Sequence, residues 1–127
     1  MDEYAKLTIM EKVDPRLNAI KDCLYRVAIK AVIIRDGKLL VVKENSSRLG
    51  LPGGGLEHDE LPAPSLAREL AEEIGLQPHE FTFEDTPLFV SYGGISGGVP
   101  RICVLYRVFL SPTAYPTKKE LPFEWLG

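Results

Sequence analysis

The hydrophobic residues of this chain group into short runs that are typical of β-strands, with polar or glycine-rich segments between them. The first strong run, Leu24 to Ile34, is rich in Val and Ile. It is followed by Asp36-Gly37, a dipeptide typical of tight turns, and by a second apolar run from Lys38 to Lys43. This pattern predicts a β-hairpin. A polar loop over 45–50 follows, and then three glycines, 53–55, whose backbone can turn sharply or be approached closely.

Two later runs, Phe81 to Tyr92 and Arg101 to Leu110, carry many β-branched and aromatic residues. They predict two more strands, joined by the glycine-rich segment 93–98. Residues 1–20 have only scattered apolar positions, and Pro15 would interrupt a helix. We therefore interpret the first 20 residues as an extension or an edge strand.

One amphipathic helix is predicted between the glycine run and the later strands. Pro62 and Pro64 fit only the first turn of a helix, the segment 65–74 consists mainly of strong helix formers, and Gly75 is a suitable C-terminal cap. At 100° per residue, the apolar positions share one arc of this helix: Leu66, Ala67, Leu70, Ala71 and Ile74. An adjoining arc carries three carboxylates: Glu69, Glu72 and Glu73.

Composition and charge limit the range of functions. The chain has 127 residues, enough for one domain with a stable core, and its hydrophobic and charged fractions of 45% and 26% are those of an ordinary globular protein. A net charge of -3 argues against a dedicated nucleic-acid surface. The N-terminus lacks an apolar signal region and no segment is long enough to span a membrane, so we expect a cytoplasmic protein. Cys23 and Cys103 lie in apolar runs and are interpreted as small buried residues.

The acidic helix is ambiguous when it is considered alone. Like charges three or four residues apart destabilise a helix by about a few tenths of a kcal/mol per pair, and only Arg68 offers local compensation, to Glu72. A solvated acidic face is the simpler interpretation. The preceding glycines favour another one, because a hard cation such as Mg²⁺ prefers carboxylate and carbonyl oxygens, and a glycine loop can turn a carbonyl toward the helix.

Loop and helix together form a longer motif: Gly54, five residues, Glu60, seven residues, and then RELAEEIGL from Arg68 to Leu76. Every fixed position matches the Nudix box, G-x5-E-x7-R-E-U-x-E-E-x-G-U, in which U is a bulky aliphatic residue. The chain therefore resembles the Nudix hydrolases, and the likeness extends from about Tyr25 to the end.

This resemblance implies an α/β fold, the α/β/α sandwich with a central mixed β-sheet. Residues 1–20 would form an N-terminal extension and residues 21–127 the Nudix domain. The sequence reaches Gly127 without a following helical pattern, which leaves open whether a C-terminal helix is missing. The implied activity is Mg²⁺- or Mn²⁺-dependent hydrolysis of the diphosphate linkage of a nucleoside diphosphate derivative, by attack of water on phosphorus.

The resemblance also assigns roles to residues of the box. The implied metal ligands are the carboxylates of Glu69, Glu72 and Glu73 and the carbonyl of Gly54. Glu60 and Arg68 correspond to supporting residues. The guanidinium of Arg68 can hold a carboxylate in one rotamer, so its loss should loosen the site rather than abolish the chemistry.

Nudix hydrolases differ in the residue that acts as general base. A box glutamate such as Glu72 serves in some members, and a carboxylate from a late loop serves in others. Glu120, five residues before Trp125, resembles the late-loop glutamate, and Glu124 is the second choice. For both, an exposed loop charge is an equally good interpretation.

The sequence leaves the substrate open. We expect the ligand to be a small nucleotide or nucleoside diphosphate derivative, and we expect no membrane partner. The sequence leaves open whether the chain forms a homodimer. Tyr92 lies 16 residues after Leu76, in a region where dinucleoside polyphosphate hydrolases carry a tyrosine, but it fits a core strand position equally well. The alternatives are a noncatalytic nucleotide-sensing domain, a class that usually lacks box carboxylates, and the prenyl diphosphate isomerase branch of the fold, whose additional cysteine and glutamate are not evident here.

Overall fold

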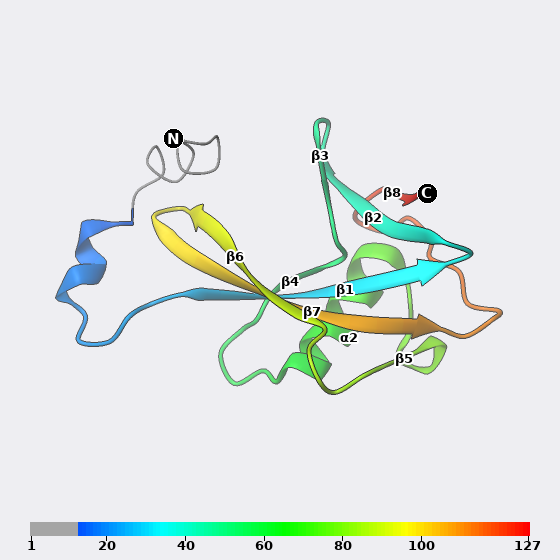
Figure 1. Cartoon of the computed structure of the whole chain (residues 1–127), viewed down its shortest axis with the longest axis horizontal. Coiled ribbons are helices and arrows are strands. Elements are labelled where there is room, and N and C mark those ends of the chain that lie inside the picture. Colours follow the sequence, from blue (N-terminus) through cyan, green and yellow to red (C-terminus); the bar gives the residue numbers. More distant parts are fainter. Residues whose placement is uncertain (1–12) are drawn as a thin grey trace.

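The computed structural model describes residues 13–127, in which a mixed β-sheet is covered on one face by the helix α2 (Pro62–Ile74), as Figure 1 shows. At the centre of the sheet, β1 (Arg26–Arg35) runs parallel to β7 (Val99–Leu110). The other strands pair antiparallel: β2 (Lys38–Asn45), β3 (Arg48–Gly50), β4 (Gly53–Gly55), β5 (Phe81–Phe83), β6 (Phe89–Ser96) and β8 (Phe123–Leu126). The main path through the sheet is β3-β2-β1-β7-β5.

The hairpin between β1 and β2 is confirmed. Asp36 and Gly37 have φ angles of 52° and 75°, and two positive values are what a type I′ turn requires. The prediction for 45–50 was wrong, because this segment forms a second hairpin in which β3 pairs with the end of β2. The backbone N–H of Ser47 donates to Oδ1 of Asn45 at 2.9 Å, so a local polar contact closes the turn that the polar composition only marked as a loop.

The three glycines form β4, which lies antiparallel to β1. Gly53 has a φ of 131°, a conformation that residues with a side chain rarely adopt, and a Cβ at this position would overlap the carbonyl oxygen of Ile29. The backbone N–H of Ala31 also donates to the carbonyl of Pro52 at 2.8 Å. The close approach expected at these glycines is thus an approach to the central strand itself.

The run from Phe81 to Tyr92 was predicted as one strand, and this was wrong. β5 ends at Phe83 and β6 begins at Phe89, and the break between them contains Pro87, which cannot donate a ladder hydrogen bond. Both strands pair with β7, at different parts of its length. The glycine-rich segment 93–98, predicted as a loop, belongs largely to the β6–β7 hairpin.

The two ends of the described chain also differ from expectation. Pro15–Ala19 forms the 3₁₀ helix η1, which begins with its proline, so no edge strand is found over 13–20. Residues 1–12, also included in the predicted extension or edge strand, lie outside the described residues. Near the other end, β8 pairs antiparallel with β2, a strand that the local pattern did not predict.

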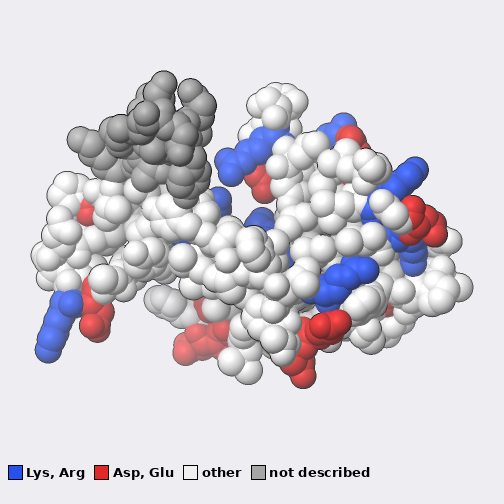
Figure 2. All heavy atoms as spheres, viewed as in Figure 1, with Lys and Arg blue, Asp and Glu red and all other residues white. Residues whose placement is uncertain are grey.

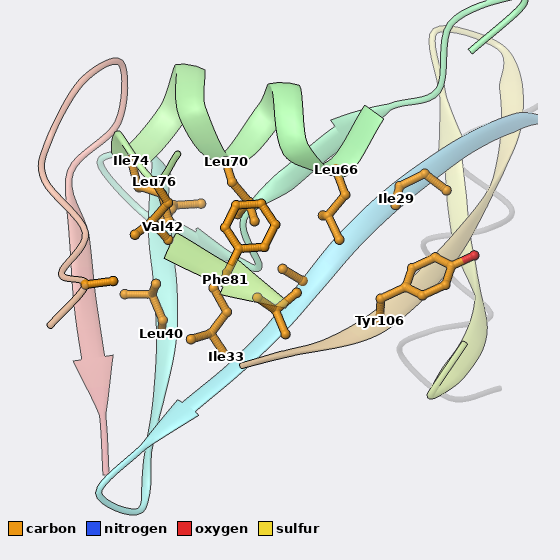
Figure 3. Close-up of a cluster of buried hydrophobic side chains, with 13 residues drawn as sticks. Ile29, Ile33, Leu40, Val42, Leu66, Leu70, Ile74, Leu76, Phe81 and Tyr106 are labelled. Atoms are coloured by element: carbon orange, nitrogen blue, oxygen red, sulfur yellow. The ribbon is translucent and has the colours of Figure 1, made fainter. Parts of the chain in front are cut away.

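The helix α2 confirms the predicted helix and its cap, with Gly75 in the left-handed conformation at a φ of 68°. Figure 3 shows the apolar side chains of α2 directed toward those of β1 and β2. The buried core consists of Ile29, Ala31, Ile33, Leu40, Val42, Leu66, Leu70, Ile74, Leu76, Phe81, Tyr106, Val108 and Ala114.

Cys23 is exposed, so its predicted burial was wrong, because it precedes β1 and lies beyond the core. Cys103 is half-buried on β7. Over residues 13–127, no helix has the length and apolar character needed to cross a bilayer.

The segment 117–121 is bound to the C-terminal end of α2. The backbone N–H of Thr117 donates to the carbonyl of Ile74 at 2.8 Å, and that of Lys119 donates to the carbonyl of Glu73 at 3.3 Å. These bonds use carbonyls that a helix end otherwise leaves without partners. The segment that carries Glu120 is therefore attached to the acidic helix.

We predict that Gly75→Ala lowers the free energy of unfolding more than Gly37→Ala does. Both substitutions place a Cβ in the left-handed region, which costs about 1–2 kcal/mol. The space around Gly37 is open, whereas a Cβ at position 75 would also displace the side chains of Thr117 and Lys119. Urea unfolding followed by circular dichroism compares the two variants. Equal losses would mean that docking of the segment 117–121 does not depend on this contact.

Candidate active site

Packing of α2 determines where its acidic side chains lie. Leu66, Leu70 and Ile74 of the helix are completely buried, which turns Glu69 and Glu73, one helical turn apart, toward β4. Glu73 is only 4% exposed. The Glu69 side chain is 16% exposed and that of Glu72 is 46% exposed. The three carboxylates thus differ in exposure: Glu73 is buried, Glu69 is half-buried and Glu72 is exposed.

The glycine strand lies directly against these carboxylates. Oε1 of Glu73 accepts a hydrogen bond of 3.0 Å from the backbone N–H of Gly53. A Cβ added to Gly54 would lie 2.6 Å from Oε1 of Glu69, which is closer than a side chain at position 54 can come. Glycine at position 54 therefore lets the backbone of β4 reach the acidic edge of α2.

Burial and a neighbouring carboxylate both disfavour the ionised form of Glu73. Burial is the larger cause, and together with Glu69 it raises the pKa of Glu73 from its usual 4.5 to about 7, although the N–H of Gly53 and the charge of Lys30 act in the opposite direction. Glu73 and Glu69 are thus neighbouring carboxylates. A cation placed between them would favour the ionised form of Glu73.

Arg68 connects the loop before α2 to the exposed side of the carboxylate arc. Its Nε donates to Oε2 of Glu60 at 2.9 Å and its Nη2 donates to Oε1 of Glu60 at 3.1 Å, a bidentate pair. The guanidinium lowers the pKa of Glu60 to about 2, aided by the backbone N–H of Glu57. Its Nη1 contacts Oε1 of Glu69 at 3.0 Å and Oε2 of Glu72 at 3.4 Å.

The carboxylates are held by protein groups rather than gathered around one point. Within residues 13–127, no three His, Cys, Asp or Glu side chains form a set ready to coordinate a metal. The cause is visible in the contacts, because Nη1 of Arg68 binds Glu69 and Glu72 while the N–H of Gly53 binds Glu73. Carboxylate and carbonyl oxygens are nevertheless the donors that a hard divalent cation prefers.

The two late glutamates lie in different surroundings. Glu120 is exposed and belongs to the segment 117–121, whose backbone is bound to the end of α2. Glu124 lies on β8 opposite Val41, and its Oε2 is 3.4 Å from Nζ of Lys43. Its neighbours on β8 pack against the core, so the alternation of a strand turns Glu124 to the sheet face opposite α2. The structure brings only the segment of Glu120 to the acidic helix.

At two further positions, Tyr92 and Lys30, the structure adds to what the sequence predicted. Tyr92 is 40% exposed on β6, so it is not a core strand residue. Lys30, which the sequence analysis did not single out, donates from Nζ to the carbonyl of Gly53 at 3.0 Å. The available signal was a lysine in the middle of an apolar strand, since a charged residue is seldom buried there without a partner.

Comparisons with known proteins show which family the chain belongs to. A family model for the NUDIX domain matches residues 24–124. The chain is 41% identical over 56 residues to a MutT-like protein of Streptomyces ambofaciens and 36% identical over 58 residues to an RNA pyrophosphohydrolase of Marinomonas sp. (strain MWYL1). These matches cover 42% and 44% of this chain but only 36% of each relative, so the chain spans little more than a third of the curated relatives it matches.

Solved structures show the same fold. A MutT NUDIX hydrolase from Burkholderia pseudomallei has a TM-score of 0.65 and 26% identity, over 81% of this chain and 83% of that one. An Ap4A hydrolase of C. elegans has a TM-score of 0.66 over 81% and 80% of the two chains, and its 16% identity shows the fold alone. The predicted α/β/α sandwich class with a mixed sheet is confirmed. Because the family model covers most of the sequence, including the whole motif from Gly54 to Leu76, the chain belongs to the NUDIX domain family.

Proposed function

We propose that the chain is a Mg²⁺- or Mn²⁺-dependent hydrolase that cleaves the diphosphate linkage of a nucleoside diphosphate derivative. The observation that carries this proposal is that the buried carboxylate of Glu73 and the neighbouring carboxylate of Glu69 both lie against the glycine strand β4. A protein gains nothing in stability from burying a carboxylate next to another one. Such a pair is explained by a cation that both carboxylates share.

The donor set fits this cation. Glu69, Glu72 and Glu73, with the carbonyl of Gly54, would supply the oxygen ligands that Mg²⁺ and Mn²⁺ accept. Once bound, a divalent ion supplies the positive charge that offsets the diphosphate and lowers the pKa of coordinated water. The net charge of -3 is therefore compatible with a polyanionic substrate.

Arg68 has a positioning role in this proposal. Its contacts with Glu69 and Glu72 are made through one nitrogen, Nη1, while Nε and Nη2 are both bound to Glu60. If Glu69 and Glu72 turn toward a cation, the bidentate pair with Glu60 still holds the guanidinium at the site. Arg68 can then keep the glutamates oriented without blocking their metal-binding oxygens.

The general base is proposed to be Glu120. Its segment is bound to the carbonyls of Glu73 and Ile74, so it can bring a carboxylate to the end of the acidic arc without a large movement of the fold. Glu124 is the weaker candidate because it is paired with Lys43 on the opposite face of the sheet. In this role Glu120 accepts a proton from the attacking water.

The substrate class is a small nucleotide derivative. The curated relatives include an RNA pyrophosphohydrolase and a MutT-like protein, and one structural neighbour is an Ap4A hydrolase. The exposure of Tyr92 on β6 favours dinucleoside polyphosphates as a second candidate class, because an exposed aromatic ring can stack on a base. A noncatalytic nucleotide-sensing domain is the competing function, and turnover distinguishes it from an enzyme.

We predict that phosphate or nucleotide release requires Mg²⁺ or Mn²⁺ and stops in EDTA. The measurement is product release across a panel of nucleoside triphosphates, diadenosine polyphosphates, ADP-ribose, NADH and nucleotide sugars. Glu72→Gln should lower kcat by orders of magnitude while the circular dichroism spectrum stays that of the parent, because Glu72 is exposed and contributes little to packing. Turnover that persists in chelator would refute the metal mechanism, and binding of nucleotides without turnover would favour the sensing domain.

We predict that Glu120→Gln lowers kcat by about a hundredfold with little change in KM, because a base acts in the transition state. Glu124→Gln is the matched control, since it removes the same charge from a neighbouring position on the opposite sheet face. Steady-state kinetics on the best substrate of the panel compare the two. Loss in the Glu124 variant alone would move the role to Glu124, and loss in neither would assign it to a box glutamate or to metal-bound hydroxide.

A further inference from the structure

A basic pocket of about 280 Å³ lies on the sheet face opposite α2. Strand alternation places it there, because the pocket-lining residues of β7 alternate with Val104, Tyr106 and Val108, which belong to the core on the α2 side. The residues used below are Lys30, Glu44, Arg48, Gly93, Arg101 and Cys103. Figure 2 shows Lys and Arg spheres where the surface is hollowed below the tip of the β2–β3 hairpin.

The pocket has more positive than negative charge. Three cationic side chains line it, from Lys30, Arg48 and Arg101, against the one carboxylate of Glu44. Glu44 is shared, with its Oε2 3.2 Å from Nε of Arg48 and its Oε1 3.8 Å from Nζ of Lys30. Within residues 13–127, Arg101 makes no ion pair.

Arg101 is left with an unused donor. Its Nε is buried and has no hydrogen-bond partner in the part of the chain that the structure describes. An unpaired buried donor on a charged group is costly, and native proteins rarely keep one without a reason. A ligand with oxygen acceptors would remove that cost.

The backbone beside Arg101 is shaped to make room for its guanidinium. The β6–β7 register shifts between Tyr92 and Ile95, which places a β-bulge opposite Arg101. A Cβ at Gly93 would lie 3.1 Å from Nε of Arg101 and 2.9 Å from Sγ of Cys103, so a side chain at this position would displace one of these two groups. Gly94 has a φ of 81°. The bulge and the glycine at position 93 thus leave space beside β6 for the side chain of Arg101.

One peptide segment separates this pocket from the acidic arc. The N–H of Gly53 is bound to Glu73, and its carbonyl accepts from Nζ of Lys30, which lines the pocket. The carboxylates proposed to hold metal and the cations of the pocket therefore lie on two sides of the same glycine. An extended polyanion could contact both.

We propose that this pocket binds a phosphate group of the substrate, other than the two joined by the bond that is cleaved, and that Arg101 is its principal donor. The inference rests on the proposed function for the identity of the ligand as substrate. It narrows the substrate class to compounds with at least three phosphates, nucleoside triphosphates or dinucleoside polyphosphates. Nucleotide sugars and ADP-ribose, which have only the cleaved diphosphate, leave the pocket without a phosphate.

Binding of inorganic tripolyphosphate to the metal-free full chain, measured by isothermal titration calorimetry in EDTA, tests the pocket without turnover. Arg101→Gln should weaken binding by about tenfold or more, as expected when a hydrogen bond to a charged group is lost, and Arg101→Lys should recover part of it. Arg16→Gln is the matched control, because Arg16 is a 90% exposed arginine outside the pocket lining. Equal affinity of the Arg101→Gln variant and the parent overturns the proposal, and so does an equal loss in the control.

Alkylation of Cys103 locates the bound phosphate independently. In a Cys23→Ser background, iodoacetamide can modify only the half-buried thiol that lines the pocket. Tripolyphosphate should slow this reaction in the parent and not with Arg101→Gln, whereas an unchanged rate in the parent overturns the proposal. If Arg101→Gln does not fold, Arg48→Gln at the rim, with a 63% exposed side chain, takes its place in both experiments and should weaken binding.

Kinetics then link the pocket to the substrate. Arg101→Gln should lower kcat/KM for a nucleoside triphosphate about tenfold or more and leave that for a nucleotide sugar with the same base unchanged. Equal losses on both substrates overturn the specificity role. Absence of any hydrolysis would refute the proposed function, while the calorimetric and alkylation results would still decide whether the pocket binds phosphate.

Discussion

The contact between the buried carboxylate of Glu73 and the backbone N–H of Gly53 joins the two halves of the candidate site. It connects α2 to β4, and β4 is in turn paired with the central strand β1. Gly53 must be glycine to approach β1 so closely, and α2 must bury its apolar stripe to point Glu73 inward. Sheet pairing at β4 and helix packing of α2 thus together form this hydrogen bond between a side chain and the backbone, and both determine where the acidic arc lies.

The acidic arc is stable in this structure because its charges are distributed over different partners. Arg68 donates to Glu60 from two nitrogens, Nε and Nη2. Its third nitrogen, Nη1, donates to Glu69 and Glu72. Glu73 accepts a hydrogen bond from the backbone N–H of Gly53, and burial with the nearby Glu69 raises its pKa to about 7. The negative charges of the site are therefore best compensated on its exposed side, beside Arg68, and least compensated at the buried Glu73. We infer that a cation acts mainly on the inner pair.

Local signals in the sequence predicted the elements whose cause is local. The Asp36-Gly37 turn and the helix bounded by its prolines and by Gly75 depend on residues within a few positions of one another. β3 and β8 have only three and four residues and exist through pairing with β2, so no period was long enough to reveal them. The split near Pro87 was readable in principle, because proline cannot join the ladder.

The sequence likewise predicted only those features of the candidate site that have a local cause. The helical period brings Glu69 and Glu73 to one side of α2. It could not show that Glu73 is buried, because burial depends on β4, nor that Lys30 and Arg101 share a pocket, because that depends on the parallel pairing of β1 with β7. Motif matching assigned roles to single residues, and only the three-dimensional fold places cations behind the glycine strand.

The melting temperature as a function of pH, without metal and with saturating Mg²⁺, tests most directly whether the buried carboxylate of Glu73 binds a cation. The folded-state pKa of Glu73 is raised, so the folded chain binds more protons than the unfolded chain between pH 4.5 and about 7, and its stability falls as the pH rises through that window. Without metal, the parent should therefore lose stability relative to Glu73→Gln between pH 5 and 8, and Mg²⁺ at pH 8 should stabilise the parent much more than the variant. Parallel pH profiles, with the same Mg²⁺ effect on both proteins, would contradict the account.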